Sequence, residues 1–496
     1  MSNQLPYDPT NQGSIFGYAR RMKGATIEEI LSWSDDSEDF DISVYANAAR
    51  KGGLGNLIEE KFFGYKANND SEPDFKEAGI ELKVSPCEVK KDGSYRAGER
   101  LVLTMISYRD PVDENFHDSH LWYKCKLLLL VYYLRNKELQ EFNKKYNRLH
   151  YYVEFVNLFT PPETDLAIIE QDYKAIVEKV MSGRAHELSE GDTMYLGACT
   201  KGATAEKSTV PQEYYNPEVK ARKRAFCYKQ SYMTHVLNEY LAKNVSTYEP
   251  IIKDAAVLKD KTFTDYIQEQ INQYVGKTDK ELCEMFSREY NNNKAQWSDL
   301  AFRMLGIRSN QAEEFEKANI AVKAFRIKSN GTLAEPMSFP TFKYDELIQQ
   351  DWEDSDLHNY FDETKFLFVV YKQTGSTYTL TGCQFWNMPY TDLQETVKDV
   401  WEDTVYKIKY GVNFEITKYG KGNVKVLNDF VSESDNRITF VKPHASLRYY
   451  EFTDGTVIGD APECMRDTLP DGTITPNFSF WLSKNYILSQ LRDDLK

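Results

Sequence analysis

The sequence of 496 residues lacks an apolar run long enough to cross a membrane. Its strongest run, Leu127 to Leu134, is far shorter than the roughly 20 residues that a spanning helix needs, so we expect a buried helix there. The start, M-S-N-Q-L-P-Y-D, lacks the charged and then apolar pattern of a secretion signal. The seven cysteines are scattered and form no C-x-x-C pair, which argues against a zinc site and favours a reduced, cytoplasmic protein.

The chain has fewer basic than acidic residues, 61 Lys and Arg against 76 Asp and Glu, and its formal net charge at pH 7 is −15. Such a balance argues mildly against a nucleic-acid partner, although binding depends on local charge. One basic run, K-A-R-K-R from residue 220 to 224, is dense enough to contact phosphate and equally consistent with a solvated face. The length and the ordinary globular composition, with 41% hydrophobic and 28% charged residues, allow two substantial domains.

The most informative stretch is S-E-P-D-F-K-E-A-G-I-E-L-K-V-S-P, which begins at Ser71. The alternation I-E-L-K-V predicts a strand with Glu81 and Lys83 on one face. A turn at Gly79 would return the chain past Asp74, so that two carboxylates and one ammonium meet at the strand end. Such a group can hold Mg²⁺ through hard oxygen ligands and stabilise a phosphodiester under attack.

An E-x-K triplet by itself is weak evidence, because others begin at Glu88, Glu218 and Glu363. A second signal lies upstream in K-G-G-L-G-N-L-I-E-E-K-F-F-G, residues 51 to 64. Its apolar positions form the stripe of an amphipathic helix. Glu59 sits beside that stripe, where it can lean toward the strand cluster as a third carboxylate.

Together, K-G-x-x-G-x-x-x-E and P-D-x6-E-x-K resemble the MutH mismatch-repair nuclease and the type II restriction endonucleases built on the same fold. The resemblance implies an α/β fold in which helices flank a mixed central sheet. It implies that Asp74 and Glu81 bind Mg²⁺, with Glu59 completing the acidic cluster or holding a second ion. It also implies that Lys83 orients the attacking water and that Lys124, in an S-H-x-x-x-K segment, faces a phosphate.

Further matches to this family concern DNA contacts. Lys201 matches a lysine in the loop that reads the major groove, where it can donate to guanine, while Cys199 replaces the usual arginine. In the strand R-A-F-C-Y-K, Cys227 falls at the position of a tyrosine near the base and Tyr228 lies one residue beyond it. The basic run before this strand is expected to face phosphate, which positions the protein without specifying sequence. Its cations are Lys220, Arg222, Lys223 and Arg224.

The second half of the chain repeats the first at a constant spacing. The stretch E-F-E-K-A-N-I-A-V-K, ending at Lys323, repeats D-F-K-E-A-G-I-E-L-K, 240 residues earlier. The loop K-P-H-A, with Lys442 and His444, repeats the recognition loop of the first half. We therefore predict two tandem restriction-endonuclease-like domains, with a catalytic domain at residues 1–240, a linker at 241–262 and a DNA-binding effector domain at 263–496.

The repeat has lost the catalytic residue types. Asp74 becomes Glu314 and Glu81 becomes Ala321, and Lys124 falls opposite Glu363. A site with one carboxylate and one lysine should hold Mg²⁺ poorly. The prediction is therefore one catalytic copy and one inactive copy.

This whole-chain pattern resembles the two-domain restriction endonucleases that cut DNA at GATC. The resemblance implies double-stranded DNA as partner, with two sites bound at once, and a monomer that pairs on DNA in the bacterial cytoplasm. It also implies a cognate methyltransferase that protects host DNA without needing to bind this chain.

Two alternatives are a MutH-like nicking enzyme of mismatch repair and a DNA-binding module that does not cut. The second copy argues against the nicking enzyme, which is a single domain. The complete catalytic set in the first copy argues against the non-cutting module.

Overall fold

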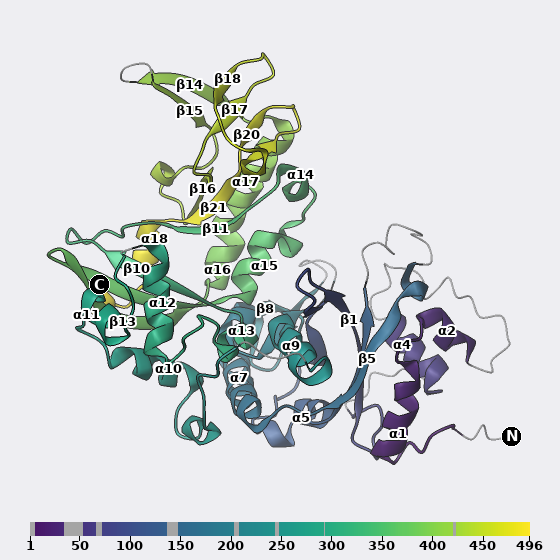
Figure 1. Ribbon diagram of the computed structural model, residues 1–496. Coiled ribbons are helices and arrows are strands. Elements are labelled where there is room, and N and C mark those ends of the chain that lie inside the picture. Colours follow the sequence, from purple (N-terminus) through teal and green to yellow (C-terminus); the bar gives the residue numbers. More distant parts are fainter. Residues whose placement is uncertain are drawn as a thin grey trace. The chain divides into compact units, whose positions relative to one another are not determined.

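The computed structural model describes residues 5–33, 53–65, 72–135, 147–202, 208–243, 248–291, 293–419 and 423–496 (Figure 1). The chain forms two compact units: unit 1 comprises Met1–Phe263 with Gln311–Asn319, and unit 2 comprises Thr264–Asn310 with Ile320–Lys496. The K-G pair that begins the upstream motif, residues 51–52, lies outside the described residues. Within the described ranges, no helix has the length and apolar character needed to cross a membrane.

Unit 1 combines mixed and antiparallel sheets with surrounding helices. Its helices are α1 (Gln12–Ala19), α2 (Ile27–Ser32), α4 (Gly53–Leu57), α5 (His120–Cys125), α7 (Glu163–Met181), α9 (Gln230–Val236) and α13 (Glu313–Ala318). Its strands are β1 (Glu81–Val89), β2 (Tyr95–Ala97), β3 (Leu101–Met105), β4 (Leu128–Leu134), β5 (Tyr152–Phe159), β6 (Leu196–Thr200), β7 (Thr209–Gln212), β8 (Asn216–Arg222) and β9 (Arg224–Tyr228).

The sheet that carries the P-D…E-x-K motif has the order β2-β1-β4-β5. Strand β1 runs parallel to β4, with Glu81 opposite Leu128, and β4 runs antiparallel to β5. The prediction of a buried helix at Leu127 to Leu134 is therefore wrong. Five consecutive residues of β4 are fully buried, and a short apolar run of this kind fits a central strand as well as a helix segment.

Unit 2 is also a mixed α/β structure. Its helices are α10 (Phe263–Asn272), α11 (Asp279–Met285), α12 (Lys294–Met304), α14 (Tyr344–Leu347), α15 (Asp356–Glu363), α16 (Tyr390–Asp392), α17 (Lys398–Tyr410) and α18 (Lys484–Gln490). Its strands are β10 (Ile320–Ile327), β11 (Met337–Thr341), β12 (Lys365–Thr374), β13 (Thr377–Trp386), β14 (Phe414–Tyr419), β15 (Asn423–Asn428), β16 (Thr439–Pro443), β17 (Tyr449–Glu451), β18 (Val457–Gly459), β19 (Arg466–Thr468), β20 (Ile474–Pro476) and β21 (Phe478–Leu482).

Strand order and direction agree between the two units. In unit 2, β10 is parallel to β12 and β12 is antiparallel to β13, as β1, β4 and β5 are in unit 1. A second sheet has the order β3-β9-β6 in unit 1 and β11-β21-β16 in unit 2, and all of these pairs are antiparallel. This agreement is what a duplicated fold would produce.

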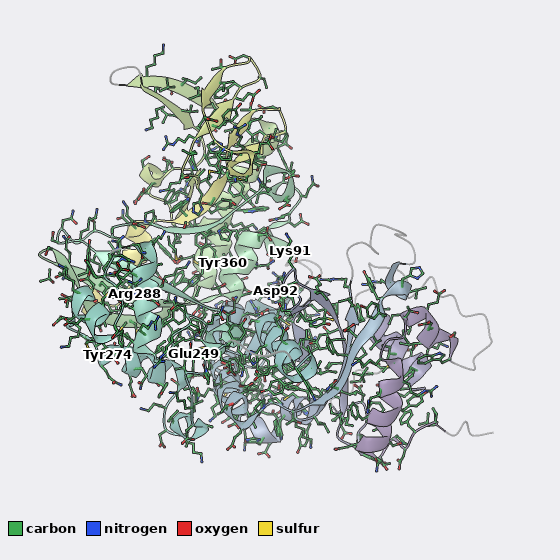
Figure 2. The ribbon with its side chains drawn as sticks, viewed as in Figure 1. Lys91, Asp92, Glu249, Tyr274, Arg288 and Tyr360 are labelled. Carbon is green, nitrogen blue, oxygen red and sulfur yellow. The ribbon has the colours of Figure 1, made fainter. Side chains whose placement is uncertain are left out.

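The segment Gln311–Asn319 belongs to unit 1, although the chain before and after it belongs to unit 2. The backbone of Glu249, labelled in Figure 2, receives a hydrogen bond from Glu313 and donates one to Gln311. Lys317 of α13 lies 2.8 Å from Asp165 and 2.7 Å from Glu313. The side chains of Lys317 and Asp165 are each only 3% exposed, so this is a buried ion pair.

We expect Lys317→Ala to lower the free energy of unfolding of unit 1 by about 3–5 kcal/mol, because it leaves the Asp165 carboxylate buried without its cation. The matched control is Arg109→Ala, which breaks an exposed pair with Glu213 in the same unit and should cost less than about 1 kcal/mol. Urea unfolding followed by circular dichroism measures both. Equal losses for the two variants would contradict a structural role for the buried pair.

Candidate active site

Asp74 reaches the start of β1 because the chain reverses between Phe75 and Ile80. These two residues pair through backbone hydrogen bonds of 2.9 and 3.3 Å, and Gly79 takes a positive φ of 67° in the turn between them. The predicted turn is confirmed. The backbone N–H of Leu82 then donates to the Asp74 carboxylate at 2.8 Å, which fixes this carboxylate beside the strand.

Glu81 lies at the centre of the cluster and is only 3% exposed. The Lys83 ammonium donates to Glu81 Oε1 at 2.8 Å, and the Lys124 ammonium lies 3.5 Å from the same oxygen. The backbone N–H of Asp74 donates to Glu81 Oε2 at 3.3 Å. Two cations and two carboxylates therefore meet where β1 begins, and Lys124 reaches them from α5.

Glu59 approaches from the segment that follows α4. The apolar stripe predicted for this helix is buried at Leu54, Leu57, Ile58 and Phe62. The last turn, Ile58–Phe62, is wound as a π-helix, a form that recurs at functional sites. Glu59 is half-buried there, and burial, followed by the Asp74 carboxylate, raises its pKa to about 7.

The carboxylates of Glu59, Asp74 and Glu81 repel one another. Burial and the neighbouring Glu81 raise the pKa of Asp74 to about 6. A divalent cation would relieve this repulsion, and carboxylate oxygens are the ligands that Mg²⁺ prefers. In the described chain, Glu59, Asp74 and Glu81 do not each bring an oxygen within 4.8 Å of the other two. The arrangement therefore fits Asp74 and Glu81 as direct ligands, with Glu59 farther out.

Tyr65 is a residue of this site to which the sequence analysis gave no role. Its hydroxyl is buried and has no hydrogen-bond partner among the described residues. Burial and then the carboxylates of Asp74 and Glu59 raise its pKa far above the usual range. The phenol therefore stays protonated beside the acidic cluster, where it can donate to an incoming oxygen. No motif spacing marks it, because it is simply the residue after F-F-G.

The DNA-contact residues predicted from sequence fall into two groups. Lys220 and Lys223 are exposed, so these two remain open to phosphate, whereas Arg222 is half-buried. Lys201 is half-buried directly after β6, and its backbone N–H donates to the carbonyl of Lys223. This pairing joins the predicted recognition loop to the basic run.

Two of the predicted DNA contacts need correction. Tyr228 has no exposed surface, and its ring packs against Tyr232 inside the unit. Arg224 is 2% exposed and donates to the Ala198 carbonyl on β6. Both lie on the central strand β9, whose side chains are all buried, so they stabilise the sheet and have no path to DNA.

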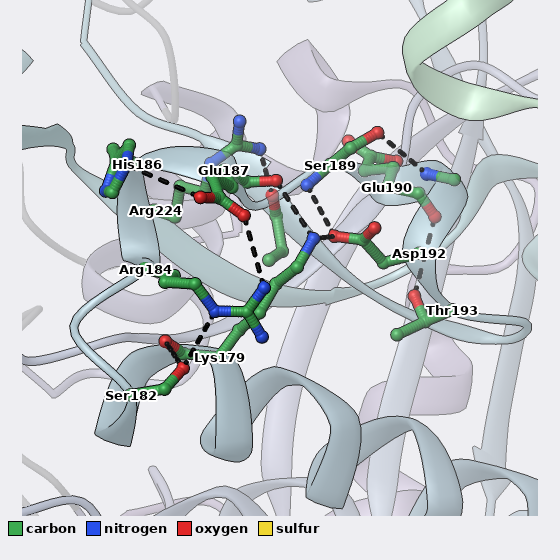
Figure 3. Close-up of polar contacts among 12 residues, drawn as sticks. Lys179, Ser182, Arg184, His186, Glu187, Ser189, Glu190, Asp192, Thr193 and Arg224 are labelled. Atoms are coloured by element: carbon green, nitrogen blue, oxygen red, sulfur yellow. Dashed lines mark hydrogen bonds and ion pairs between the residues drawn. The ribbon is translucent and has the colours of Figure 1, made fainter. Parts of the chain in front are cut away.

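The segment that leads into β6 is held by polar contacts (Figure 3). The Lys179 ammonium donates to Asp192 at 2.7 Å and to the Glu187 carbonyl at 3.0 Å. The buried Asp172 carboxylate accepts hydrogen bonds from three successive backbone N–H groups, at Met194, Tyr195 and Leu196. The strand before Lys201 therefore has a defined position.

In unit 2, the residues predicted to contact DNA lie at the end of β16. The ammonium of Lys442 lies 4.0 Å from the ring centroid of Trp481. His444 is exposed, and its Nδ1 lies 3.1 Å from the Ser479 hydroxyl. Glu314, which replaces Asp74, lies in the segment Gln311–Asn319 of unit 1, where it accepts hydrogen bonds from the backbone N–H groups of Ile251 and Ile252 of the same unit. This carboxylate therefore has a structural role.

Comparison with known proteins identifies the family. A family model for the DNA mismatch repair enzyme MutH matches residues 63–172, which include Asp74, Glu81, Lys83 and Lys124. The chain is 34% identical to the type II restriction enzyme Sau3AI of Staphylococcus aureus over 467 residues, which are 89% of this chain and 93% of that enzyme. The chain belongs to this family of MutH-like type II restriction enzymes. As a member, it is a site-specific deoxyribonuclease.

The MutH proteins match this chain over less than half of its length. The chain is 27% identical to MutH of Shewanella woodyi over 205 residues, 41% of this chain and 81% of that protein. It is 24% identical to MutH of Shewanella amazonensis over 217 residues, 42% of this chain and 86% of that protein. The part of the chain that these two MutH proteins do not cover is therefore largely shared with Sau3AI.

In metal-free protein at pH 8, we expect Asp74→Asn to raise the free energy of unfolding by about 1–2 kcal/mol. Folding raises the Asp74 pKa from 3.8 to about 6, so the folded state holds the proton to higher pH than the unfolded chain. Stability therefore falls as pH rises through this window. The increase in the free energy of unfolding caused by Asp74→Asn should be complete above pH 6 and should vanish near pH 4.

Thermal unfolding measured across this pH range tests the expectation, with the exposed Glu77→Gln in the same turn as a control that should change little. Mg²⁺ should stabilise the unaltered protein more than Asp74→Asn, because ligand binding to the folded state adds to stability. A variant that is less stable at pH 8 would contradict the repulsion argument.

Proposed function

We propose that this restriction enzyme makes Mg²⁺-dependent double-strand breaks in DNA at 5′-GATC-3′, and that unit 2 binds a second site as an effector. The observation that carries the catalytic part is the convergence of Asp74, Glu81 and Lys83, with Glu59 and Lys124 close by. These residues come from the π-helical turn after α4, the turn before β1, β1 itself and α5, and their types match the requirements of phosphodiester hydrolysis.

Asp74 and Glu81 would hold the ion, with Glu59 completing the acidic cluster through water or with a second ion. When bound, Mg²⁺ supplies positive charge beside the scissile phosphate and lowers the pKa of a water molecule. Lys83, held at 2.8 Å from Glu81, would orient the attacking water. Lys124 would hold a non-bridging phosphate oxygen from α5, which leaves the Tyr65 hydroxyl as a further donor.

The recognition sequence is proposed from the family resemblance. Lys201 follows β6, where a major-groove lysine would donate to guanine. The exposed cations on β8 and after it would contact the DNA backbone, which positions the duplex. Cys199, at the place of the usual arginine, is buried, so guanine recognition here would lack that contact.

The effector role of unit 2 is supported by two observations. Its strand order and directions agree with those of unit 1, and the changes from Asp74 to Glu314 and from Glu81 to Ala321 fall on metal ligands. Such a copy would retain DNA binding while losing hydrolysis. We propose a monomer that pairs on DNA.

A nicking enzyme of mismatch repair is the second candidate, and the identity to Sau3AI over nearly the full chain weighs against it. The third candidate, a DNA-binding module without cleavage, has no use for the clustered carboxylates of unit 1. Unmethylated plasmid incubated with Mg²⁺ or with a chelator, followed by sequencing of the ends, separates the three. Double-strand breaks at GATC support the restriction enzyme, and nicks alone support the nicking enzyme. DNA that is bound but stays intact supports the module without cleavage.

Glu81→Ala should reduce cleavage by at least about 10²–10³-fold while sparing DNA binding, because it removes a metal ligand and a partner of Lys83. The matched control is Glu314→Gln, at the corresponding position of Asp74, which keeps an acceptor oxygen for one of the backbone N–H groups of Ile251 and Ile252. It should leave the cleavage step unchanged. Single-turnover cleavage and filter binding measure the two effects, and strong cleavage by Glu81→Ala would refute the site.

Lys220→Ala and Lys223→Ala should each lower the slope of log K against log salt for DNA binding by about 0.9. Tyr228→Phe should leave both affinity and slope unchanged, because the ring is buried. Fluorescence anisotropy at several salt concentrations, in the Glu81→Ala background, measures these quantities. An unchanged slope in both lysine variants would place the DNA backbone elsewhere.

A further inference from the structure

A cavity of about 210 Å³ lies in unit 2 beside the start of α12 and the strand β10. This is the position that corresponds, in the repeat, to the catalytic strand of unit 1. Its lining includes Lys294, Lys323, Arg326 and Glu335, together with Trp297 and Ser338. The cavity therefore gathers three cations and one carboxylate, in a chain whose net charge is −15.

The single carboxylate does not balance these cations. Glu335 lies 3.0 Å from Arg326 and 3.7 Å from Lys294, and its side chain is 52% exposed. Exposed ion pairs of this kind contribute little and rearrange easily. The formal surplus of positive charge in the cavity makes an anion the complementary ligand.

Lys323 is the decisive residue. It corresponds to Lys83, whose ammonium donates to Glu81 at 2.8 Å, but the position of Glu81 is taken by Ala321. Within the described part of the chain, the ammonium of Lys323 makes no hydrogen bond or ion pair, although the residue is half-buried. Burial and then the charge of Lys294 lower its pKa. A bound anion would offset both the burial of the ammonium and its repulsion by Lys294, because it supplies the missing negative charge.

Arg326 is held in a fixed orientation. Its guanidinium lies over the ring of Trp297, 5.2 Å from the centroid, and 5.7 Å from the centroid of Tyr378. A planar, pre-oriented guanidinium loses little entropy when it binds a tetrahedral oxyanion. Strand β10 is outermost in the order β10-β12-β13, so the cavity borders a sheet edge.

The cavity also lies near the predicted DNA surface of unit 2. The charges of Lys294 and Glu335 both act on Lys442, the lysine at the end of β16 that repeats the recognition loop. A duplex contacting Lys442 would therefore bring its backbone close to Lys294.

We propose that this cavity binds a phosphate group at the edge of the sheet, where Lys323 and Arg326 approach it from opposite faces of β10 and Lys294 lies at its entrance. In unit 1, the acidic cluster needs a metal cation before it can hold a phosphate. In unit 2, where the corresponding carboxylates are lost, the lysine and arginine side chains hold the phosphate directly. The phosphate is either a phosphodiester of the DNA backbone or a free phosphate ion. Its assignment to DNA rests on the effector function proposed for unit 2.

The test is the rate at which an acylating reagent modifies Lys323 in the full-length Glu81→Ala protein, followed by peptide mass spectrometry. An ammonium with a lowered pKa reacts readily, and a bound anion blocks it. Inorganic phosphate at about ten times its dissociation constant should slow the modification about tenfold. The exposed Lys409 of α17, which does not line the cavity, is the matched control and should react at a constant rate.

A GATC-containing duplex forms the second arm. Slower modification with both phosphate and duplex supports the site and assigns it to the DNA backbone. Slower modification with phosphate alone supports the site and assigns it to the free ion. An unchanged rate of Lys323 modification with both ligands overturns the proposal.

Cleavage by Lys323→Glu separates this proposal from the proposed function. If the cavity holds a DNA phosphate, this variant should cut single-site DNA at the unaltered rate and lose the stimulation by a second site. Unaltered stimulation overturns the assignment to DNA. A protein that cut no DNA under any condition would refute the proposed function, while the labelling experiment would still report on the phosphate site.

Discussion

The structure of the candidate active site depends on how the negative charge of one buried carboxylate, Glu81, is balanced by nearby cations. Glu81 is almost fully enclosed, and the cations of Lys83 and Lys124 contact the same one of its oxygens. Asp74, brought close by the turn before β1, adds a second negative charge, and Glu59 adds a third from the π-helical turn. Two ammonium groups cannot balance three ionised carboxylates. Burial first, and then this deficit, raises the pKa values of Asp74 and Glu59.

The same balance explains the contrast between the two units. At the start of β10, an alanine stands where β1 has Glu81, and the ammonium of Lys323 has no hydrogen-bond or ion-pair partner in the described chain. The cluster around β1 has a surplus of negative charge that suits a cation, whereas the cavity beside β10 has a surplus of positive charge that suits an anion. A few changes in residue type on a shared scaffold would be enough to reverse the preferred ligand, because few charges are present and the surroundings are partly desolvated.

The strand β9 illustrates a second constraint, which is that a strand whose side chains are all buried cannot serve as a binding surface. Resemblance to the family placed Tyr228 and Arg224 near DNA. In the structure, β9 lies between β3 and β6 and all its side chains are buried, so its neighbours carry the accessible residues. Lys220 and Lys223 remain exposed beside it, and Lys201 follows the edge strand β6.

The sequence by itself determined which residues meet at the first site. The spacing of Asp74, Glu81 and Lys83 is local, since a turn and a strand of period two suffice to bring them together, and the structure contains both. The same holds for the apolar stripe before Glu59. Tertiary structure alone decided that Leu128–Leu134 is a central strand, because an apolar run of this length carries no periodicity that separates a strand from a helix.

Tertiary structure also decided which polar residues stay accessible. It buried Tyr228 and Arg224, gave Glu314 two backbone partners in unit 1, and placed the Tyr65 hydroxyl beside the acidic cluster. These outcomes depend on contacts between residues distant in sequence. A motif records the spacing of residues along the chain, and burial is set by the elements that pack around them.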